Sequence, residues 1–184
     1  MREEIFMAGL GGQGVLLAGQ LLSQAAMDAG LELSWYPMYS PEVRGGEATC
    51  TLVYADERVG SPIAGHPRAV MLMEPRAIAA HMDRCASGGL AVINTSLGEV
   101  PIPRDDLTVL RVPADEIAAE CGSERAMNLV LLGAYLGAKR PELVELAIAA
   151  LSEVLPERHH RHIPMDAEAL RRGCAVAAAA GGAG

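Results

Sequence analysis

Short apolar runs and longer amphipathic runs alternate along the chain. The short runs have the length of buried strands, so we expect strands at 4–8, 32–38, 47–55, 68–73, 90–94 and 107–113. The longer runs repeat apolar residues at helical spacing, which predicts helices at 14–29, 74–86, 113–122, 125–139, 141–155 and from 166 onward. Such alternation is typical of an α/β domain with a mostly parallel sheet.

The predicted fold class is α/β, with three α/β/α layers and a mostly parallel, partly mixed sheet. The mixed part is expected at 47–63, where two strand candidates follow each other with no helix between them. We expect a single domain at 1–173, because 184 residues are too few for two ordinary domains. The Ala/Gly-rich tail at 174–184 has little to pack and is expected to fray.

Composition narrows the possible partners. Hydrophobic residues make up 51% of the chain and aromatic residues only 3%, so the core must be mainly aliphatic. A net charge of -8 with thinly spread arginines opposes a nucleic-acid groove. No run approaches the roughly 18 apolar residues of a membrane span, and the start lacks the features of a signal peptide. We therefore expect a cytoplasmic protein without nucleic-acid or membrane partners.

The cysteines and the single lysine exclude several site types. No two cysteines have the CxxC spacing of zinc or iron–sulfur sites, so we expect buried, reduced thiols at Cys50, Cys85, Cys121 and Cys174. A P-loop needs a lysine directly after its last glycine, but Val15 follows Gly14 and the only lysine is Lys139.

The sequence gives even less support for a catalytic or metal-binding role of other residues. His159, His160 and His162 lie in a proline-flanked segment, which is more typical of a solvated connection than of a metal site. No Ser-His-Asp arrangement or carboxylate pair can be identified from spacing. The sequence therefore predicts no metal ligand and no catalytic residue in this chain.

A glycine-rich turn joins the first strand to the first helix. Gly9, Gly11 and Gly14 satisfy the pattern G-x-G-x-x-G, and Gly12 adds a fourth glycine. Glycines tolerate positive φ and close approach of another group, and the free N–H groups of the helix start favour an anion. The turn at 9–14 either contacts an anion or cofactor, or only makes a tight strand–helix connection.

Two features disfavour NAD at this turn. The dinucleotide fold needs an acidic residue at the end of the second strand, which here ends near "WYPMYS". Glu32 lies at the opposite end of that strand, and Gln13 inside the turn is unusual for the fingerprint.

A second unusual segment, "SPEVRGG", spans 40–46 and contains Ser40, Pro41, Arg44, Gly45 and Gly46. Loops that follow strands gather at the carboxyl edge of an open sheet, so we expect this segment beside the glycine turn. Arg44 could then receive a phosphate or carboxylate, the alternative being a solvated arginine in a turn.

Asn128 is a polar residue within the strongly apolar helix expected at 125–139. Because a buried amide must be paired, it either satisfies a neighbouring backbone group or lies at an interface.

Four motifs together resemble one family. "GLGGQG", "YSPEVRGGEATC", "GSP" at 60–62 and "AMNLVLLGA" at 126–134 occur in the same order in gamma subunits of 2-oxoacid:ferredoxin (acceptor) oxidoreductases. The resemblance extends to about residue 170 and is greatest to the 2-oxoglutarate or broad 2-oxoacid branch, which includes pyruvate and ketoisovalerate enzymes. Indolepyruvate oxidoreductase beta subunits share the glycine motif, so the substrate branch stays open. Ser40 stands where the family often has glycine.

The resemblance implies a division of labour. Such enzymes convert a 2-oxoacid and coenzyme A into acyl-CoA and carbon dioxide while reducing ferredoxin. Thiamine diphosphate lies between the alpha and beta subunits, and iron–sulfur clusters lie in the beta and ferredoxin-like delta subunits. The gamma subunit packs on alpha, helps to assemble the site and receives coenzyme A. The candidate cofactor contacts are Gly9, Gly11, Gly12, Gln13, Gly14, Ser40, Pro41, Arg44, Gly45, Gly46 and Asn128.

The chain alone is expected to bind no cofactor firmly, to be inactive, and to self-associate through apolar surface at 35–46 and 125–139. Two other hypotheses remain: a free-standing NAD or FAD oxidoreductase, and a non-enzymatic nucleotide-binding or scaffold module.

Overall fold

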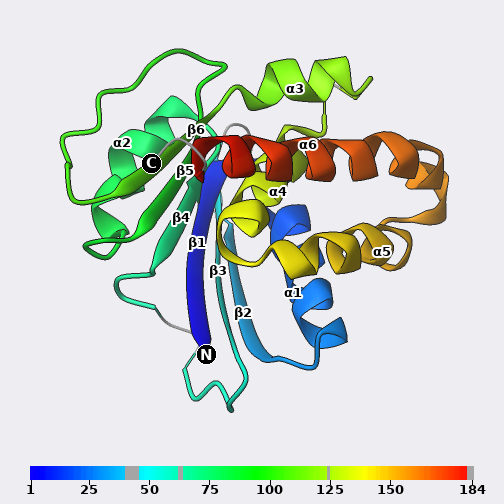
Figure 1. The fold of residues 1–184 in the computed structure, drawn as a ribbon, viewed down its shortest axis with the longest axis horizontal. Helices are drawn as coiled ribbons and strands as arrows, with labels where there is room; N and C mark the ends of the chain where they lie inside the picture. Colours follow the sequence, from blue (N-terminus) through cyan, green and yellow to red (C-terminus); the bar gives the residue numbers. More distant parts are fainter. Residues whose placement is uncertain (40–45, 62–63, 124, 182–184) are drawn as a thin grey trace.

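The structure is a computed structural model that describes residues 1–39, 46–61, 64–123 and 125–181. Its centre is a six-stranded sheet with the order β2-β3-β1-β4-β5-β6 (Figure 1). The strands are β1 (Arg2–Leu10), β2 (Glu32–Tyr39), β3 (Glu47–Ala55), β4 (Ala69–Leu72), β5 (Leu90–Asn94) and β6 (Thr108–Val112). Each corresponds to a strand predicted from the apolar runs.

The sheet is mixed because of β3. This strand runs antiparallel to both of its neighbours, β1 and β2, whereas the β1–β4, β4–β5 and β5–β6 pairs are parallel. The predicted mixed α/β sheet is therefore confirmed. Residues 56–61 form a bend and irregular chain rather than the short strand expected after β3, so the antiparallel pairing comes from β3 itself.

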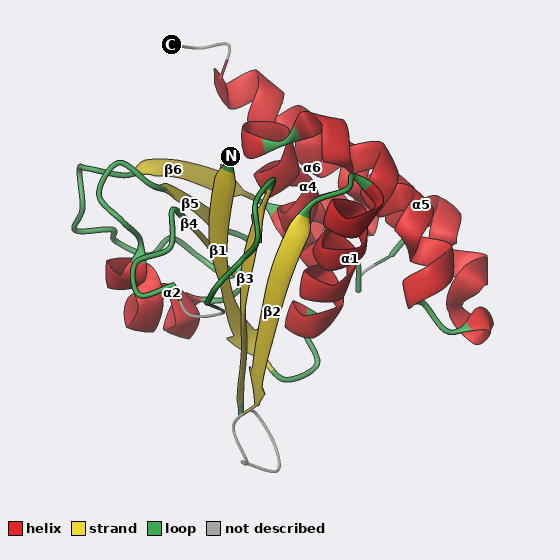
Figure 2. Cartoon of the chain, turned by 90° about the horizontal axis from the view of Figure 1, so that it is seen from below, coloured by secondary structure: helices red, strands yellow, loops and turns green. Residues whose placement is uncertain are grey.

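Helices cover both faces of the sheet unequally. The α-helices are α1 (Val15–Asp28), α2 (Pro75–His81), α3 (Ala114–Glu120), α4 (Met127–Lys139), α5 (Val144–Val154) and α6 (Ile163–Gly181). Short 3-10 turns follow α2 and flank α5: η1 (Met82–Arg84), η2 (Pro141–Leu143) and η3 (Glu157–His162). Figure 2 shows α2 on one side of the sheet and α1, α4, α5 and α6 on the other. In the described ranges, no helix combines the length and hydropathy needed to cross a membrane.

Alternation along the strands produces a separate core on each face. In β4, Met71 belongs to the large core under α1 and α4, whereas Val70 and Leu72 belong to the small core under α2. β1 divides in the same way, with Met7 in the large core and Phe6 in the small one. Strands buried on both faces explain why their sequences read as continuous apolar runs.

Helix α4 lies between the sheet and α6, and it contacts α6 at backbone distance. A Cβ atom on Gly133 would lie 2.1 Å from the carbonyl oxygen of Leu170, and one on Gly173 would lie 2.0 Å from that of Val130. Residues Met127–Leu136 of α4 are all buried. The expectation that 125–139 exposes apolar surface is therefore wrong, because α6 covers the helix.

The close contact between α4 and α6 continues toward the C-terminal end of α6. A Cβ atom on Gly137 would lie 2.7 Å from the carbonyl oxygen of Cys174, and Ala177 is 7% exposed. Helix α6 accordingly runs through to Gly181, across most of the segment for which the composition suggests fraying. The division of the chain at residue 173 stays a prediction.

Candidate ligand-binding site at the carboxyl edge of the sheet

The glycine turn adopts backbone conformations that require glycine. Gly12 has φ +95° and Gly14 has φ +81°, in the region that L side chains rarely adopt. A Cβ atom on Gly14 would lie 2.4 Å from Nδ2 of Asn128, whereas one on Gly12 would meet nothing within 4 Å. Gly14 is thus needed for conformation and for packing, while Gly12 faces open space.

Gln13 braces this turn from within. Its Oε1 accepts a hydrogen bond of 2.7 Å from the backbone N–H of Leu10, and its own N–H donates to the Leu10 carbonyl at 3.1 Å. A Cβ atom on Gly9 would lie 2.6 Å from that same Oε1. The side-chain carbonyl of Gln13 therefore holds the turn's shape, a role that spacing alone does not reveal.

The start of α1 is not capped by any side chain and has no acidic residue in its first turn. The helical hydrogen bond to the N-cap carbonyl is donated by the N–H of Ala18, which lies 3.0 Å from the carbonyl oxygen of Gly14. The N–H groups before Ala18 have no partner within the helix, and the helix dipole points its positive end at the same place. This geometry suits an anion.

Asn128 joins the glycine turn to α4. It is 2% exposed, and its Nδ2 donates to the carbonyl of Gly14 at 3.0 Å across 114 residues of sequence. The sequence left two roles for Asn128, pairing with a backbone group or lying at an interface. The structure shows the first of these, the pairing with a backbone group. Its contact with a cofactor remains a prediction.

Only the end of the predicted arginine segment can be placed. Ser40, Pro41, Arg44 and Gly45 lie outside the described residues. The carbonyl of Gly46 accepts a hydrogen bond of 2.9 Å from the N–H of Gly11. The segment therefore ends directly against the glycine turn.

A network of hydrogen bonds around Asn94 lies at the carboxyl end of β5, further along the same edge of the sheet. Asn94, at the end of β5, donates to the Met73 carbonyl at 3.1 Å and to Oδ2 of Asp115 at 2.8 Å. Its Oδ1 accepts from the N–H groups of Ser96 and Ala114 at 3.1 and 3.2 Å. Because the amide is fully used within the protein, Asn94 fastens β4, β5 and α3 together rather than offering a ligand contact.

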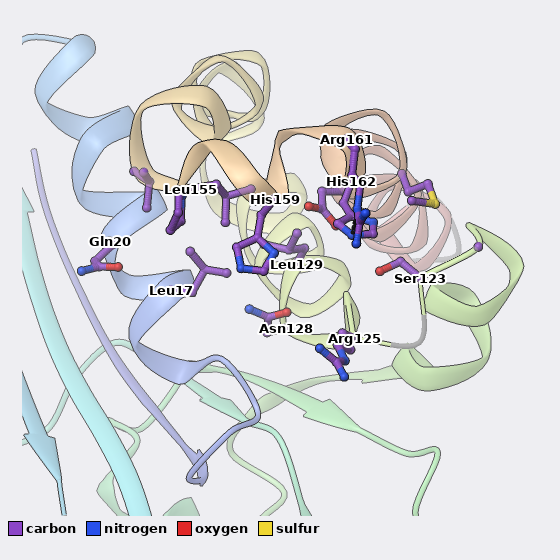
Figure 3. A pocket seen from close by; sticks show the side chains of 15 residues that line it. Leu17, Gln20, Ser123, Arg125, Asn128, Leu129, Leu155, His159, Arg161 and His162 are labelled. Carbon is purple, nitrogen blue, oxygen red and sulfur yellow. Dashed lines mark hydrogen bonds between the residues drawn. The ribbon is translucent and has the colours of Figure 1, made fainter.

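A cavity of about 980 Å³ opens between α1, the start of α4, and the corner formed by α5, η3 and α6 (Figure 3). Its polar lining includes Ser123, Arg125, Asn128, His159, Arg161 and His162. Apolar side chains, among them Leu17, Leu129, Leu155 and Pro156, form the remaining wall. Asn128 thus lies at both the glycine turn and the cavity.

The histidine segment is the part of this site that sequence reasoning missed. We expected a solvated connection, but the segment forms η3, and the half-buried His159 and His162 line the cavity with ring centroids 6.4 Å apart. Asp166 of α6 also lines the cavity; it is 9% exposed, and burial raises the pKa of its carboxyl. The described part of the chain holds no group of three or more His, Cys, Asp or Glu that could bind a metal.

Among the described residues, the strand order does not provide the usual position for a dinucleotide ribose. β3 lies between β1 and β2, so the second strand is not the neighbour of the strand that carries the glycine turn. β2 ends at Tyr39 and carries Glu32 at its start. The sheet order thus agrees with the sequence in disfavouring NAD at this turn.

Comparison with known proteins identifies the family. The chain matches the pyruvate ferredoxin/flavodoxin oxidoreductase family over residues 4–176. It belongs to this family. It is 32% identical over 163 residues to the 2-oxoglutarate synthase subunit KorC of Methanothermobacter marburgensis, covering 85% of this chain and 88% of KorC. It is 38% identical over 130 residues to the ketoisovalerate oxidoreductase subunit VorA of the same organism, covering 71% of this chain but only 27% of VorA.

Solved structures of family members share the fold. The gamma subunit of a keto/oxoacid ferredoxin oxidoreductase from Geobacter sulfurreducens superposes with a TM-score of 0.82 at 24% identity, covering 98% of both chains. A 2-oxoglutarate:ferredoxin oxidoreductase from Magnetococcus marinus, solved with 2-oxoglutarate, coenzyme A and succinyl-CoA, gives 0.82 at 22% identity over 97% of this chain and 31% of that one. The α/β architecture is therefore that of the family.

Proposed function

We propose that this chain is the gamma subunit of a cytoplasmic 2-oxoacid:ferredoxin oxidoreductase, acting with alpha, beta and ferredoxin-like delta subunits. The observation that carries the proposal is family membership over 4–176, together with a KorC relative of nearly the same extent. In the reaction, a 2-oxoacid and coenzyme A give acyl-CoA, carbon dioxide, a proton and a pair of electrons, which pass to ferredoxin.

The redox centres and thiamine diphosphate are assigned to the partner subunits. Iron–sulfur clusters need thiolate ligands, and burial raises the pKa of Cys50 to about 12 and that of Cys85 above its usual range. These two buried thiols lie in separate cores on opposite faces of the sheet, so they cannot act together as ligands of one cluster. Cys121 and Cys174 are free and half-buried.

The described surface at the glycine turn suits coenzyme A. When bound, its thiol takes up the acyl group. The uncapped start of α1 and the open space at Gly12 suit a phosphate, and a large cavity adjoins them through Asn128. The chain's part is to hold the anionic end of coenzyme A while partner subunits perform the chemistry.

Reconstitution tests this assignment. The chain is combined with its alpha, beta and delta partners, and acyl-CoA formation is measured with 2-oxoglutarate, ketoisovalerate, pyruvate and indolepyruvate, with ferredoxin as acceptor. We expect turnover only from the complex, and the preferred oxoacid identifies the branch. Ferredoxin or viologen reduction by the purified chain alone would contradict the subunit assignment.

A further inference from the structure

His81, the last residue of α2, is held in one position by packing on β1. Helix α2 lies on the face of the sheet opposite α1 (Figure 2), and at its start the side chain of Glu74 accepts a hydrogen bond of 3.0 Å from the N–H of Ala77. The centroid of the His81 ring lies 5.0 Å from that of the Phe6 ring, and only 15% of the His81 side chain is exposed. The guanidinium of Arg84 lies 4.1 Å from the centroid of the same phenyl ring. The imidazole is therefore a fixed group rather than a freely moving surface side chain.

This imidazole connects α2 to β3. Its Nε2 lies 2.6 Å from Oε1 of Glu47, the first residue of β3. A carboxylate oxygen only accepts, so Nε2 of His81 carries a proton and donates the hydrogen bond. The Glu47 side chain is 44% exposed, which makes His81 the more firmly held partner. The bond thus joins two elements whose bonded residues are 34 positions apart in the sequence.

The start of β3 is also where the sheet meets the glycine turn. Glu47 lies opposite Leu10 in the antiparallel β1–β3 pair. One position further along this register, the N–H of Gly11 donates to the carbonyl of Gly46 at 2.9 Å. The N–H of Leu10 is bonded instead to the side chain of Gln13. The Gly11–Gly46 bond is therefore at the end of the strand pair, where backbone hydrogen bonds open most readily.

We propose that His81 is a positioning residue for the glycine turn. By holding Glu47, it keeps the start of β3 against β1 and so keeps the adjoining bond between Gly11 and Gly46 closed. Gly12 follows directly, with positive φ and open space around it, so its position depends on that bond. His81 acts on the turn through the backbone rather than by contact with a ligand. The consequence for coenzyme A rests on the proposed function, whereas the effect on the turn does not.

Amide exchange in the full chain, followed residue by residue by NMR, tests the effect on the turn. His81→Phe keeps a ring against Phe6 but loses the donor, so the N–H of Gly11 should exchange about 2- to 10-fold faster if the lost bond has ordinary strength. His81→Gln keeps a donor but loses the ring, so its Gly11 exchange should stay closer to that of the parent. The N–H of Gln13, which donates to Leu10 within the turn, should exchange at the parent rate in both variants.

Variants of the acceptor complete the comparison. Glu47→Ala should speed Gly11 exchange as much as His81→Phe does, and the double variant should add nothing, because both changes remove the same bond. Glu145→Ala is the matched control, since it removes an exposed carboxylate that pairs with Arg171 between α5 and α6. Thermal melting of each variant identifies a general loss of stability. Gly11 exchange that is unchanged in His81→Phe, or faster only in His81→Gln, would overturn the proposal, because ring packing would then account for His81.

The reconstituted complex tests the consequence for coenzyme A. His81→Phe should raise the half-saturating coenzyme A concentration by a similar factor and leave kcat near the parent value, because the turn is proposed to meet the anionic end and not the thiol. A general folding defect would instead lower kcat by reducing the amount of active complex. Faster Gly11 exchange with unchanged half-saturation would exclude a role of His81 in coenzyme A binding. A parent complex without turnover would contradict the proposed function and leave the exchange result in force.

Discussion

At the scale of single residues, the glycine turn is held by a lock between Gly14 and Asn128. The glycine leaves space for the amide, and the amide satisfies the glycine's carbonyl at 3.0 Å. Each residue depends on the other, although they belong to helices that are distant in the sequence. The lock also fixes the start of α1 relative to α4, so it orders the proposed anion site.

Substitutions in the turn test this lock. Gly14→Ala should destabilise the protein more than Gly12→Ala, because both force alanine into positive φ but only the first meets Asn128. The shared backbone strain is about 1–2 kcal/mol. Urea unfolding measures the difference, which should shrink in an Asn128→Ala background once the amide is gone. Equal losses from Gly12→Ala and Gly14→Ala would show that no packing lock exists.

Asn128→Ala in the parent chain removes a buried donor and leaves the Gly14 carbonyl without this bond. The expected loss is about 1–3 kcal/mol of unfolding free energy.

Arg44 is tested through coenzyme A dependence, as its segment ends against the turn at Gly46. If its guanidinium meets a phosphate, Arg44→Ala should weaken the contact by about 1.5–3 kcal/mol, or raise the half-saturating coenzyme A concentration by roughly 10- to 150-fold. Arg44→Lys keeps the charge and loses the fork, so it should recover only part of the affinity. Normal assembly and a normal coenzyme A response in the Arg44→Ala complex would reduce Arg44 to a solvated turn residue.

The residues of the turn are predictable because the glycine pattern is local, whereas their partners are not. Nothing near Gln13 in sequence shows that its amide bonds Leu10, and nothing near Asn94 shows that it fastens three elements. The cavity was missed for the same reason. Arg125 and His159 are 34 positions apart in the sequence, and the packing of the helices brings both to the lining of one cavity.

At the scale of elements, the contact between α4 and α6 depends on small residues. Gly133 and Gly173 let the two backbones touch, which no larger residue permits without displacement. Helix α6 in turn carries Asp166 and follows η3, so the position of the histidine segment depends on this contact.

Gly133→Ala should therefore lower the melting temperature markedly. The added methyl would lie 2.1 Å from the Leu170 carbonyl oxygen, and forced overpacking of this kind typically costs 1–3 kcal/mol or more. Gly181→Ala is the comparison in α6, because a Cβ atom added there would meet nothing within 4 Å. This substitution should leave the melting temperature unchanged or raise it slightly, since alanine has the higher helix propensity. Calorimetric melting compares them, and equal melting temperatures would exclude backbone contact between α4 and α6.

The elements themselves follow from hydrophobic spacing, but their order in space does not. Each strand appears where an apolar run predicts it, because burial on one or both faces dictates local composition. The insertion of β3 between β1 and β2 depends on long-range pairing, for which the sequence offers only the absence of a helix at 47–63.

At the scale of the whole molecule, one edge remains apolar and open. Tyr36 and Met38 are 47% and 55% exposed and share one face of the edge strand β2, two positions apart. On the opposite face, Trp35 packs against the core with α1, whereas Tyr39, at the end of the strand, is 63% exposed. Pro37 removes one backbone donor from this edge and so works against pairing with a further strand. A partner would therefore meet the side chains of this face rather than extend the sheet.

If the proposed function is right, the isolated chain should self-associate through these side chains, because apolar area that would meet a partner subunit stays in contact with water. Replacing Tyr36 and Met38 together by serine should raise the dissociation constant of the associated species by at least about tenfold, since burying each large apolar side chain is worth roughly 1.5–3 kcal/mol. Sedimentation velocity over a concentration series measures the change. Met27→Ser is the control, as Met27 is 50% exposed and belongs to α1 rather than to the β2 strand. Adding the alpha subunit should compete with self-association, because both would use the same face. A parent chain that stays monomeric at every concentration would contradict this face as a docking surface.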